Sequence, residues 1–304
     1  MSLLGFLCVN KPRKMTSRDA VNIAQGVARA ELGGGRGNRV VSKAGHAGTL
    51  DPLADGVLVI GIGPAVRLVP YVQAHSKTYV GTFKLGAESA SGDLEEPVTE
   101  RPDGHVPTAD ELNAVLTSFV GQIRQRPPSF SAIKVNGRRL YLDARAGRDV
   151  EVPERTVVIH AIKVLDYGYP ELKLEITCGS GTYIRTLGID IAAAVGTFAV
   201  MTALTRTAIG PFIIDQSIGI ERLRKGGLDQ LLIPALRGVD HMPVISCDQE
   251  QSRRLGDGLC IETTPQIEFE VQEAAAVAPD GQLRAIVKRK LDQWCPYRVF
   301  PASS

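Results

Sequence analysis

The spacing of apolar residues along the chain predicts strands and helices that interleave. Residues 171–178 (ELKLEITC) carry an apolar side chain at every second position, which is typical of a strand with one buried face. Residues 56–62 (GVLVIGI) form a short β-branched apolar run, which indicates a buried strand. Three further strands are expected at residues 5–10, 77–85 and 199–208.

Helices are expected where a polar capping residue precedes a helical pattern. Thr16 or Ser17 can cap a helix that continues to about residue 31. Thr108 and Glu111 have the spacing of a capping box, which predicts a helix that continues to about residue 119. A third helix is expected at residues 183–194. Because strands and helices interleave without a regular βαβ rhythm, the pattern favours an α+β fold with a mixed sheet.

Two polar segments interrupt this pattern. Residues 33–38 are rich in glycine and indicate a flexible loop; no strand precedes them, so they do not form a phosphate-binding fingerprint. Residues 126–155, called the thumb segment below, are polar, basic and punctuated by prolines. We expect the thumb segment to be a surface excursion with a short helix near residues 138–146.

The C-terminal part of the chain changes character after about residue 243. One short helix is expected at residues 246–258, followed by short strands separated by turns, at residues 274–278, 283–287 and 297–300. The sequence therefore predicts a large domain over residues 1–240 and a small β-rich domain over residues 241–304.

The charge of the chain permits an RNA partner without requiring one. The net charge is +2 and the sequence pI is about 8.3, less basic than many nucleic-acid-binding proteins. Basic residues nevertheless gather in three clusters, at residues 11–18, 36–43 and 134–148. No apolar run approaches the roughly 20 residues of a membrane span. The apolar start followed by basic residues is the reverse of a secretory signal, so we expect a cytoplasmic protein.

The five cysteines give no sign of a disulfide framework or a zinc site. They are odd in number, widely spaced and include no Cys-x-x-Cys pair. We expect isolated, reduced thiols that pack as small apolar side chains, and no metal site.

Residues 45–58 (GHAGTLDPLADGVL) carry the strongest chemical signal in the chain. Asp51 lies in a glycine-punctuated loop directly before the buried strand, and Pro52 restricts the backbone behind it. A carboxylate held rigidly in this way suits a catalytic acid, base or nucleophile. An Asp-Pro pair is also a common turn former, so the loop taken alone leaves both interpretations open.

The Asp51 loop resembles the signature of the TruB family of tRNA pseudouridine synthases, in which a Gly-His-x-Gly-Thr-Leu-Asp-Pro loop carries the catalytic aspartate. Further segments resemble motifs of this family in the same order. These are Lys11-Pro12 with Met15-Thr16-Ser17, Lys77-Thr78-Tyr79 with Leu85-Gly86, residues 127–137 (PPSFSAIKVNG), residues 181–187 (GTYIRTL), and Leu204-x-Arg206-Thr207 with Gly210-Pro211-Phe212. The resemblance covers residues 5–240, and a weaker one to a small RNA-binding domain of the PUA type follows.

The resemblance implies a pseudouridine synthase fold with a mixed, mostly antiparallel sheet, and conversion of one uridine in the T-loop of tRNA to pseudouridine without a cofactor. Asp51 would be the catalytic carboxylate, and Arg185 would bind it bidentately and keep it charged and oriented. Tyr79 would stack on the turned-out uracil, and Leu204 would form an apolar wall that excludes water.

The resemblance also implies a set of RNA contacts, with the thumb segment as the part that grips the RNA. His46 would stack beneath the neighbouring flipped bases, since flat side chains offset part of the cost of unstacking a base. The other implied RNA contacts are Lys11, Phe130, Lys134, Arg145, Tyr183 and Arg206. The expected partner is tRNA, bound through its T-arm, with no obligate protein partner.

Several positions depart from the family pattern. Asp55 stands where a threonine is usual, Phe130 replaces a tyrosine, and Thr205 replaces the first of two arginines. Ser89 and Ser91 stand in for paired threonines. None of these departures removes Asp51, Tyr79 or Arg185, so they bear on RNA affinity more than on catalysis.

Two alternative functions remain open at this point. The first is an RNA chaperone that binds the tRNA elbow without catalysis, although binding alone gives no reason to keep Asp51, Tyr79 and Arg185 together. The second is a guide-RNA-dependent pseudouridine synthase, which shares the aspartate loop. That group lacks a thumb of the kind seen in residues 131–134 (SAIK), so a stand-alone bacterial-type enzyme is the favoured interpretation.

Overall fold

The computed structural model describes residues 3–33, 43–128, 134–135, 138–139, 152–262 and 270–301. The chain divides into two compact units. The first comprises Met1–Pro52, Val57–Gln73 and Pro211–Ser304, and the second comprises Leu53–Gly56 and Ala74–Gly210. Strand β3 (Ala54–Ile62) belongs to both, because its first residues pair within the second unit and its remainder lies in the first.

The second unit is built on a mixed sheet in the order β3-β12-β4-β11-β10-β7. Only the β3–β12 pair is parallel, so the predicted mixed and mostly antiparallel sheet is confirmed. The strands are β12 (Ala199–Ile209), β4 (Lys77–Leu85), β11 (Glu171–Cys178), β10 (Arg155–Gly168) and β7 (Gly121–Gln125). A hairpin of β5 (Ala87–Ser89) and β6 (Val98–Glu100) forms a small separate sheet.

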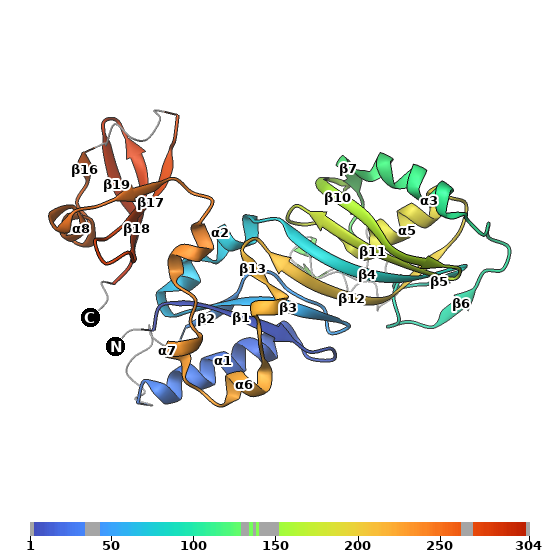
Figure 1. Cartoon of the computed structure of the whole chain (residues 1–304), viewed down its shortest axis with the longest axis horizontal. Helices are drawn as coiled ribbons and strands as arrows, with labels where there is room; N and C mark the ends of the chain where they lie inside the picture. Colours follow the sequence, from blue (N-terminus) through green and yellow to red (C-terminus); the bar gives the residue numbers. More distant parts are fainter. Residues whose placement is uncertain are drawn as a thin grey trace. The chain divides into compact units, whose positions relative to one another are not determined.

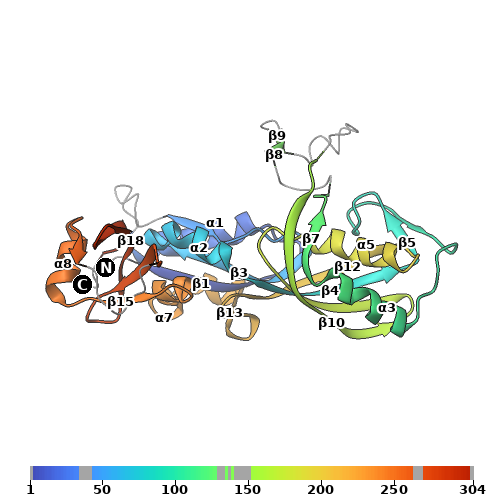
Figure 2. The same ribbon diagram turned by 90° about the horizontal axis from the view of Figure 1, so that it is seen from above.

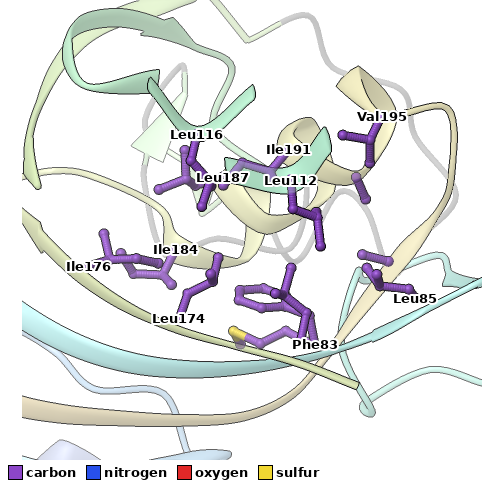
Figure 3. Close-up of a cluster of buried hydrophobic side chains, with 14 of the residues drawn as sticks. Phe83, Leu85, Leu112, Leu116, Leu174, Ile176, Ile184, Leu187, Ile191 and Val195 are labelled. Carbon is purple, nitrogen blue, oxygen red and sulfur yellow. The ribbon is translucent and has the colours of Figure 1, made fainter. Parts of the chain in front are cut away.

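One face of this sheet is covered by the helices α3 (Ala109–Leu116) and α5 (Ile184–Ala194). Figure 3 shows Leu187 and Ile191 of α5 on one side of the core, with Phe83 of β4 and Leu174 of β11 on the other. The alternation predicted for β11 is confirmed, because its four apolar residues are buried and belong to this core. Burial of one large apolar side chain such as Phe83 contributes about 1.5–3 kcal/mol relative to exposure.

The first unit begins with strands in the order β14-β1-β3-β2, where β1 is Gly5–Lys11, β2 is Ala44–His46 and β14 is Ile218–Gly219. Helix α1 (Ser17–Glu31) packs its apolar side on these strands, with α6 (Ile220–Arg224) and α7 (Leu228–Leu231) beside it (Figure 1). Thr16 is the N-cap of α1, in a capping box with Asp19. Short helical turns complete this part, namely η1 (Gly63–Leu68), α2 (Val69–Ala74), η3 (Ile214–Gln216) and η4 (Ala235–Val239).

The C-terminal residues of the first unit form a separate five-stranded sheet in the order β15-β17-β18-β19-β16. The strands are β15 (Val244–Ser246), β16 (Ile261–Glu262), β17 (Glu273–Val277), β18 (Leu283–Lys290) and β19 (Gln293–Val299), and helix α8 (Gln249–Gly256) packs on them. The core of this sheet, with Trp294 fully buried, comes from residues 245–294 alone. The predicted β-rich character of this region is confirmed.

The expectation that all cysteines are isolated thiols is wrong. Cys260 and Cys295 form a disulfide, and their α-carbons lie 4.1 Å apart. The antiparallel pairing of β16 with β19, which places Ile261 opposite Trp294, brings the two cysteines together from a separation of 35 residues. Cys8, Cys178 and Cys247 are buried thiols outside this disulfide, as expected.

The thumb region differs in part from its prediction. Strands β7 and β10, which flank it, were not predicted. Arg138–Arg139 forms strand β9, paired with β8 (Lys134–Val135), where the sequence predicted the start of a helix. The rest of that predicted helix and most of the predicted 33–38 loop lie outside the described residues.

Throughout the described ranges, every helix falls short of the length and apolar content that a membrane span requires.

Candidate active site

Asp51 lies in the loop between β2 and β3. Its two neighbours in the chain are anchored by the first residue of α1 and by the turn that follows β1. The Ser17 hydroxyl donates to the Leu50 carbonyl at 2.9 Å and accepts from the Leu50 N–H at 2.8 Å. On the other side, the Lys14 N–H donates to the Pro52 carbonyl at 2.6 Å. Asp51 itself is exposed. The carboxylate is therefore accessible while the backbone that carries it is fixed on both sides.

Lys11 supports this arrangement from inside the protein. Its side chain is fully buried, and its ammonium donates to the carbonyls of Pro12 at 3.0 Å and Met15 at 2.8 Å. These bonds hold the turn that carries Lys14, whose backbone adopts a left-handed φ of 67°. The structure thus shows Lys11 holding the backbone of this turn, and its predicted contact with RNA stays a prediction.

His46 precedes the Asp51 loop as the last residue of β2. It lies opposite Ile60 of β3, and the next residue, Ala47, donates its N–H to the Val59 carbonyl at 2.8 Å. Its side chain is half-buried. The strand pairing therefore fixes the start of the loop, and the predicted stacking of His46 on RNA bases stays a prediction.

In the second unit, Tyr79, Leu204 and Arg206 share one face of the sheet. Tyr79 of β4 lies opposite Arg206 of β12, and Leu204 lies two residues before Arg206. Directly opposed residues, and residues two apart in one strand, point to the same face. Tyr79 and Leu204 are partly buried and pack against the core beneath α5. The structure thus brings both together on the face that α5 covers.

Arg206 was predicted to contact RNA, but only 2% of its surface is exposed. Its backbone is closely approached by Gly56, which has φ of 99° and where a Cβ would lie 2.2 Å from the Arg206 carbonyl oxygen. Burial, and then the charge of Arg206, lower the pKa of the neighbouring Lys77 to about 8. Arg206 is therefore buried beside Lys77, and its predicted contact with RNA stays a prediction.

Arg185 lies at the start of α5 and is buried. Its guanidinium donates to the Ser91 carbonyl at 2.9 Å and forms a buried ion pair with Asp93. The Ser91 hydroxyl donates to the other Asp93 oxygen at 2.6 Å, and the Glu95 N–H donates to the same oxygen at 2.9 Å. Asp93 was not singled out in the sequence. The predicted pairing of Arg185 with Asp51 stays a prediction.

Gly92 explains how the Asp93 loop comes so close to Arg185. Its φ is 75°, and a Cβ there would lie 2.6 Å from Ile189 and 3.3 Å from the methylene groups of Arg185. The Ser-Gly-Asp sequence at residues 91–93 was the available signal, because serine and aspartate around a glycine are typical of a tight turn.

The departures Asp55 and Thr205 lie opposite each other in the parallel β3–β12 pair. Since side chains alternate along a strand, both point away from the face that carries Leu204 and Arg206. The two departures from the family pattern are therefore neighbours on the other face of the sheet.

The remaining predicted RNA contacts are only partly described. Tyr183 is half-buried immediately before α5, and the Arg155 guanidinium lies 4.7 Å from the centre of its ring. Phe130 and Arg145 lie outside the described residues, and of Lys134 the structure describes the backbone of β8 alone.

Comparisons with known proteins agree with these features. Residues 36–184 match the TruB family pseudouridylate synthase (N terminal domain). A curated protein of Rhodopirellula baltica, tRNA pseudouridine synthase B, is 39% identical, with 99% of this chain and 96% of that protein covered. The protein of the same name from Dehalococcoides mccartyi is 35% identical, with 97% and 96% covered.

Solved structures share the fold at lower identity. A structure of an H/ACA ribonucleoprotein bound to a substrate RNA containing 2′-deoxyuridine has a chain with a TM-score of 0.72 and 22% identity, covering 98% of this chain and 85% of that chain. A Cbf5-Nop10-Gar1 complex has one with a TM-score of 0.69 and 23% identity, covering 98% and 84%. The predicted fold class is confirmed. On the strength of its near full-length similarity to curated relatives, the chain belongs to the TruB family of pseudouridylate synthases.

Proposed function

We propose that this protein isomerises uridine 55 in the T-loop of tRNA to pseudouridine, with Asp51 as the catalytic carboxylate. The observation that carries the proposal is the state of Asp51, whose exposed carboxylate lies in a loop fixed on both sides by Ser17 and Lys14. Full-length relatives named tRNA pseudouridine synthase B support the substrate class.

The reaction needs one carboxylate and no cofactor, because the uracil is both leaving group and returning nucleophile. The N1–C1′ bond breaks, the detached uracil turns, and a C5–C1′ bond forms. C5 then loses its proton, and N1, which has lost its bond to C1′, gains one, so no atom is gained or lost overall. Asp51 attacks C1′ directly or assists removal of the C2′ proton, and both routes require the ionised carboxylate.

The residues of the second unit supply the surroundings of the reaction. Tyr79 offers a ring for the turned-out uracil, and Leu204 offers an apolar wall that protects the detached base from water. Arg185 supplies the positive charge of its guanidinium for the proposed catalytic carboxylate of Asp51.

Two basic surfaces of the first unit suit the phosphates of the T-arm. An open cavity of about 540 Å³ beside the β1–α1 turn is lined by Arg13, Lys14 and Arg224. On the C-terminal sheet, Tyr297 is 51% exposed, and the Lys288 ammonium lies 3.9 Å from the centre of its ring. An exposed aromatic ring beside cations is the usual platform for RNA bases. Residues 241–304 thus form an RNA-binding domain of the PUA type under this proposal.

Under this proposal the protein acts on tRNA in the cytoplasm, without an obligate protein partner. A guide-dependent role gains no support from the H/ACA structures, because identities of 22–23% carry the fold only. A pure RNA chaperone leaves the anchored Asp51 loop without a purpose.

The test is release of tritium from a tRNA transcript labelled at C5 of its uridines. Formation of each pseudouridine releases one C5 proton, so the purified chain should release one equivalent per tRNA without added metal or guide RNA. A transcript with cytidine at position 55 is the matched control and should release none. Tight binding of the transcript with no release would support the chaperone instead.

A further inference from the structure

Gln125, which directly precedes the thumb segment, and Arg155, the last residue of that segment, contact the turn from which α5 begins. Strands β7 and β10 lie side by side (Figure 2). Strand β7 ends at Gln125 and strand β10 begins at Arg155, and these two residues lie directly opposite each other in the antiparallel pair. Both side chains reach the turn formed by residues 181–183. Arg185 follows this turn by two residues.

Gln125 binds the backbone of Tyr183 at two points. Its Nε2 donates to the Tyr183 carbonyl at 3.0 Å, and its Oε1 accepts from the Tyr183 N–H at 2.8 Å. Only 1% of Gln125 is exposed, so water does not compete for these bonds. The Tyr183 carbonyl also accepts the first bond of α5, from the Leu187 N–H at 3.0 Å. Gln125 therefore fixes the backbone group on which the helix starts.

Arg155 holds the same turn from its other end. Its Nη2 donates to the Gly181 carbonyl, and its guanidinium lies 4.7 Å from the centre of the Tyr183 ring. A cation over an aromatic face is attracted by the ring quadrupole. The turn is thus held at residue 181 by one strand and at residue 183 by its neighbour.

The position of Arg185 depends on this turn, because its guanidinium must reach two defined partners in the loop at residues 91–93. It must reach the Ser91 carbonyl, at 2.9 Å, and Asp93 from the first turn of α5. We propose that Gln125 and Arg155 are positioning residues that set the start of α5 and, through it, the guanidinium of Arg185. They link the segment proposed to grip RNA to the helix proposed to act in catalysis. The inference rests on the proposed function.

The first experiment compares two identical changes in one strand. Gln125→Met keeps the length of the side chain and removes both bonds to Tyr183. Gln122→Met makes the same change at an exposed position of β7 and is the matched control. A misplacement of about 1 Å costs on the order of 100-fold in rate. We expect Gln125→Met to lower the single-turnover rate of tritium release by about 10- to 100-fold. The dissociation constant for tRNA should stay within about twofold, and Gln122→Met should match wild type.

The second experiment separates positioning from a general loss of structure. In an Arg185→Lys background, Gln125→Met should have little further effect, because the group it positions is already altered. Arg155→Gln should behave in the same way and serves if Gln125→Met folds poorly.

If the double variant lost rate by the product of the two single losses, Gln125 and Arg185 would act independently and the inference would be overturned. A Gln125→Met protein that loses tRNA binding but keeps the wild-type single-turnover rate would also overturn it. An unchanged rate for both Gln125→Met and Arg155→Gln would do the same. These outcomes are distinct from failure of the proposed function, in which the wild-type protein releases no tritium.

Discussion

The Asp51 loop and the Arg185 site hold their charged groups in opposite ways. Asp51 is exposed, and the bonds that fix it are made by the backbones of Leu50 and Pro52. Arg185 is buried, and the bonds that fix it are made by its own guanidinium, to Asp93 and Ser91. The anion can therefore be changed without disturbing its support, whereas the cation cannot.

This difference teaches which residues report on chemistry and which report on folding. An exposed carboxylate is solvated in the folded and the unfolded chain, so neutralising it costs little stability. A buried cation loses its hydration on folding and relies on its counter-ion. A variant of Asp51 should therefore separate activity from stability, and variants around Arg185 should couple them.

The largest expected effect is that of Asp51→Asn. The amide cannot act as an anion at C1′ or C2′, so turnover should fall by at least about 10³-fold. The free energy of unfolding in urea should change by less than about 0.5 kcal/mol, because the side chain is exposed. Tritium release and urea titrations of one preparation check both. Turnover within tenfold of wild type would remove Asp51 from the mechanism.

Asp93→Asn should lower both turnover and the free energy of unfolding. It leaves the buried Arg185 without its counter-ion, which costs about 3 kcal/mol of stability, and it loosens the guanidinium in the site. Asp103→Asn is the matched control, because Asp103 pairs with Arg101 in the same unit but is 63% exposed. The control should cost less than about 1 kcal/mol. Equal losses from the two variants would mean that burial of the Arg185–Asp93 pair has no energetic consequence.

Ser17→Ala tests the support of the Asp51 loop. The change removes both bonds to Leu50 and leaves that buried N–H and carbonyl unpaired, at about 1–3 kcal/mol. Turnover should fall by about tenfold, since the loop keeps its second anchor at Pro52. Ser118→Ala, which removes an exposed serine hydroxyl bonded to the Val115 carbonyl, is the control and should leave turnover unchanged. Wild-type turnover in Ser17→Ala would show that Asp51 needs no such support.

The sequence predicted the elements that follow a clean period. The bounds of β4 and β11 agree with the expected ranges, and α1 and α3 begin after the predicted capping threonines. Strand β10 was missed because two register shifts, after Ile159 and after Val164, break its alternation. A bulge places two residues opposite one and moves the following side chains to the other face.

In the candidate site, the sequence predicted the residues that lie within the family motifs, and it missed contacts that only the folded chain brings together. Asp93 escaped notice because its role depends on Arg185, which lies 92 residues further along the chain. Lys11 and Arg206 were expected on the surface because lysine and arginine are rarely buried unless paired. Tertiary packing buries both here. The disulfide escaped for the same reason, since only strand pairing brings Cys260 and Cys295 together.

The smallest expected effect concerns Lys77, which is a second buried cation in the unit that contains Arg185. Burial first, and then repulsion by Arg206, lower its pKa from 10.5 to about 8. Below about pH 8 the lysine is charged in the folded and unfolded states, and its burial penalty is constant. Between pH 8 and 10.5 the unfolded chain keeps a proton that the folded chain has lost, so this penalty shrinks as pH rises.

Lys77→Met removes the titrating amine, so a comparison with wild type shows whether this group makes stability rise or fall with pH. The free energy of unfolding of wild type, minus that of Lys77→Met, should become more positive between pH 7 and pH 9.5 in urea titrations. Lys77→Arg keeps its charge at both pH values. The free energy of unfolding of wild type, minus that of Lys77→Arg, should therefore rise by the same amount between pH 7 and pH 9.5. A difference that is flat or falls with pH would show that Lys77 keeps its proton when folded. Unequal increments against the two variants would assign the pH dependence to another group.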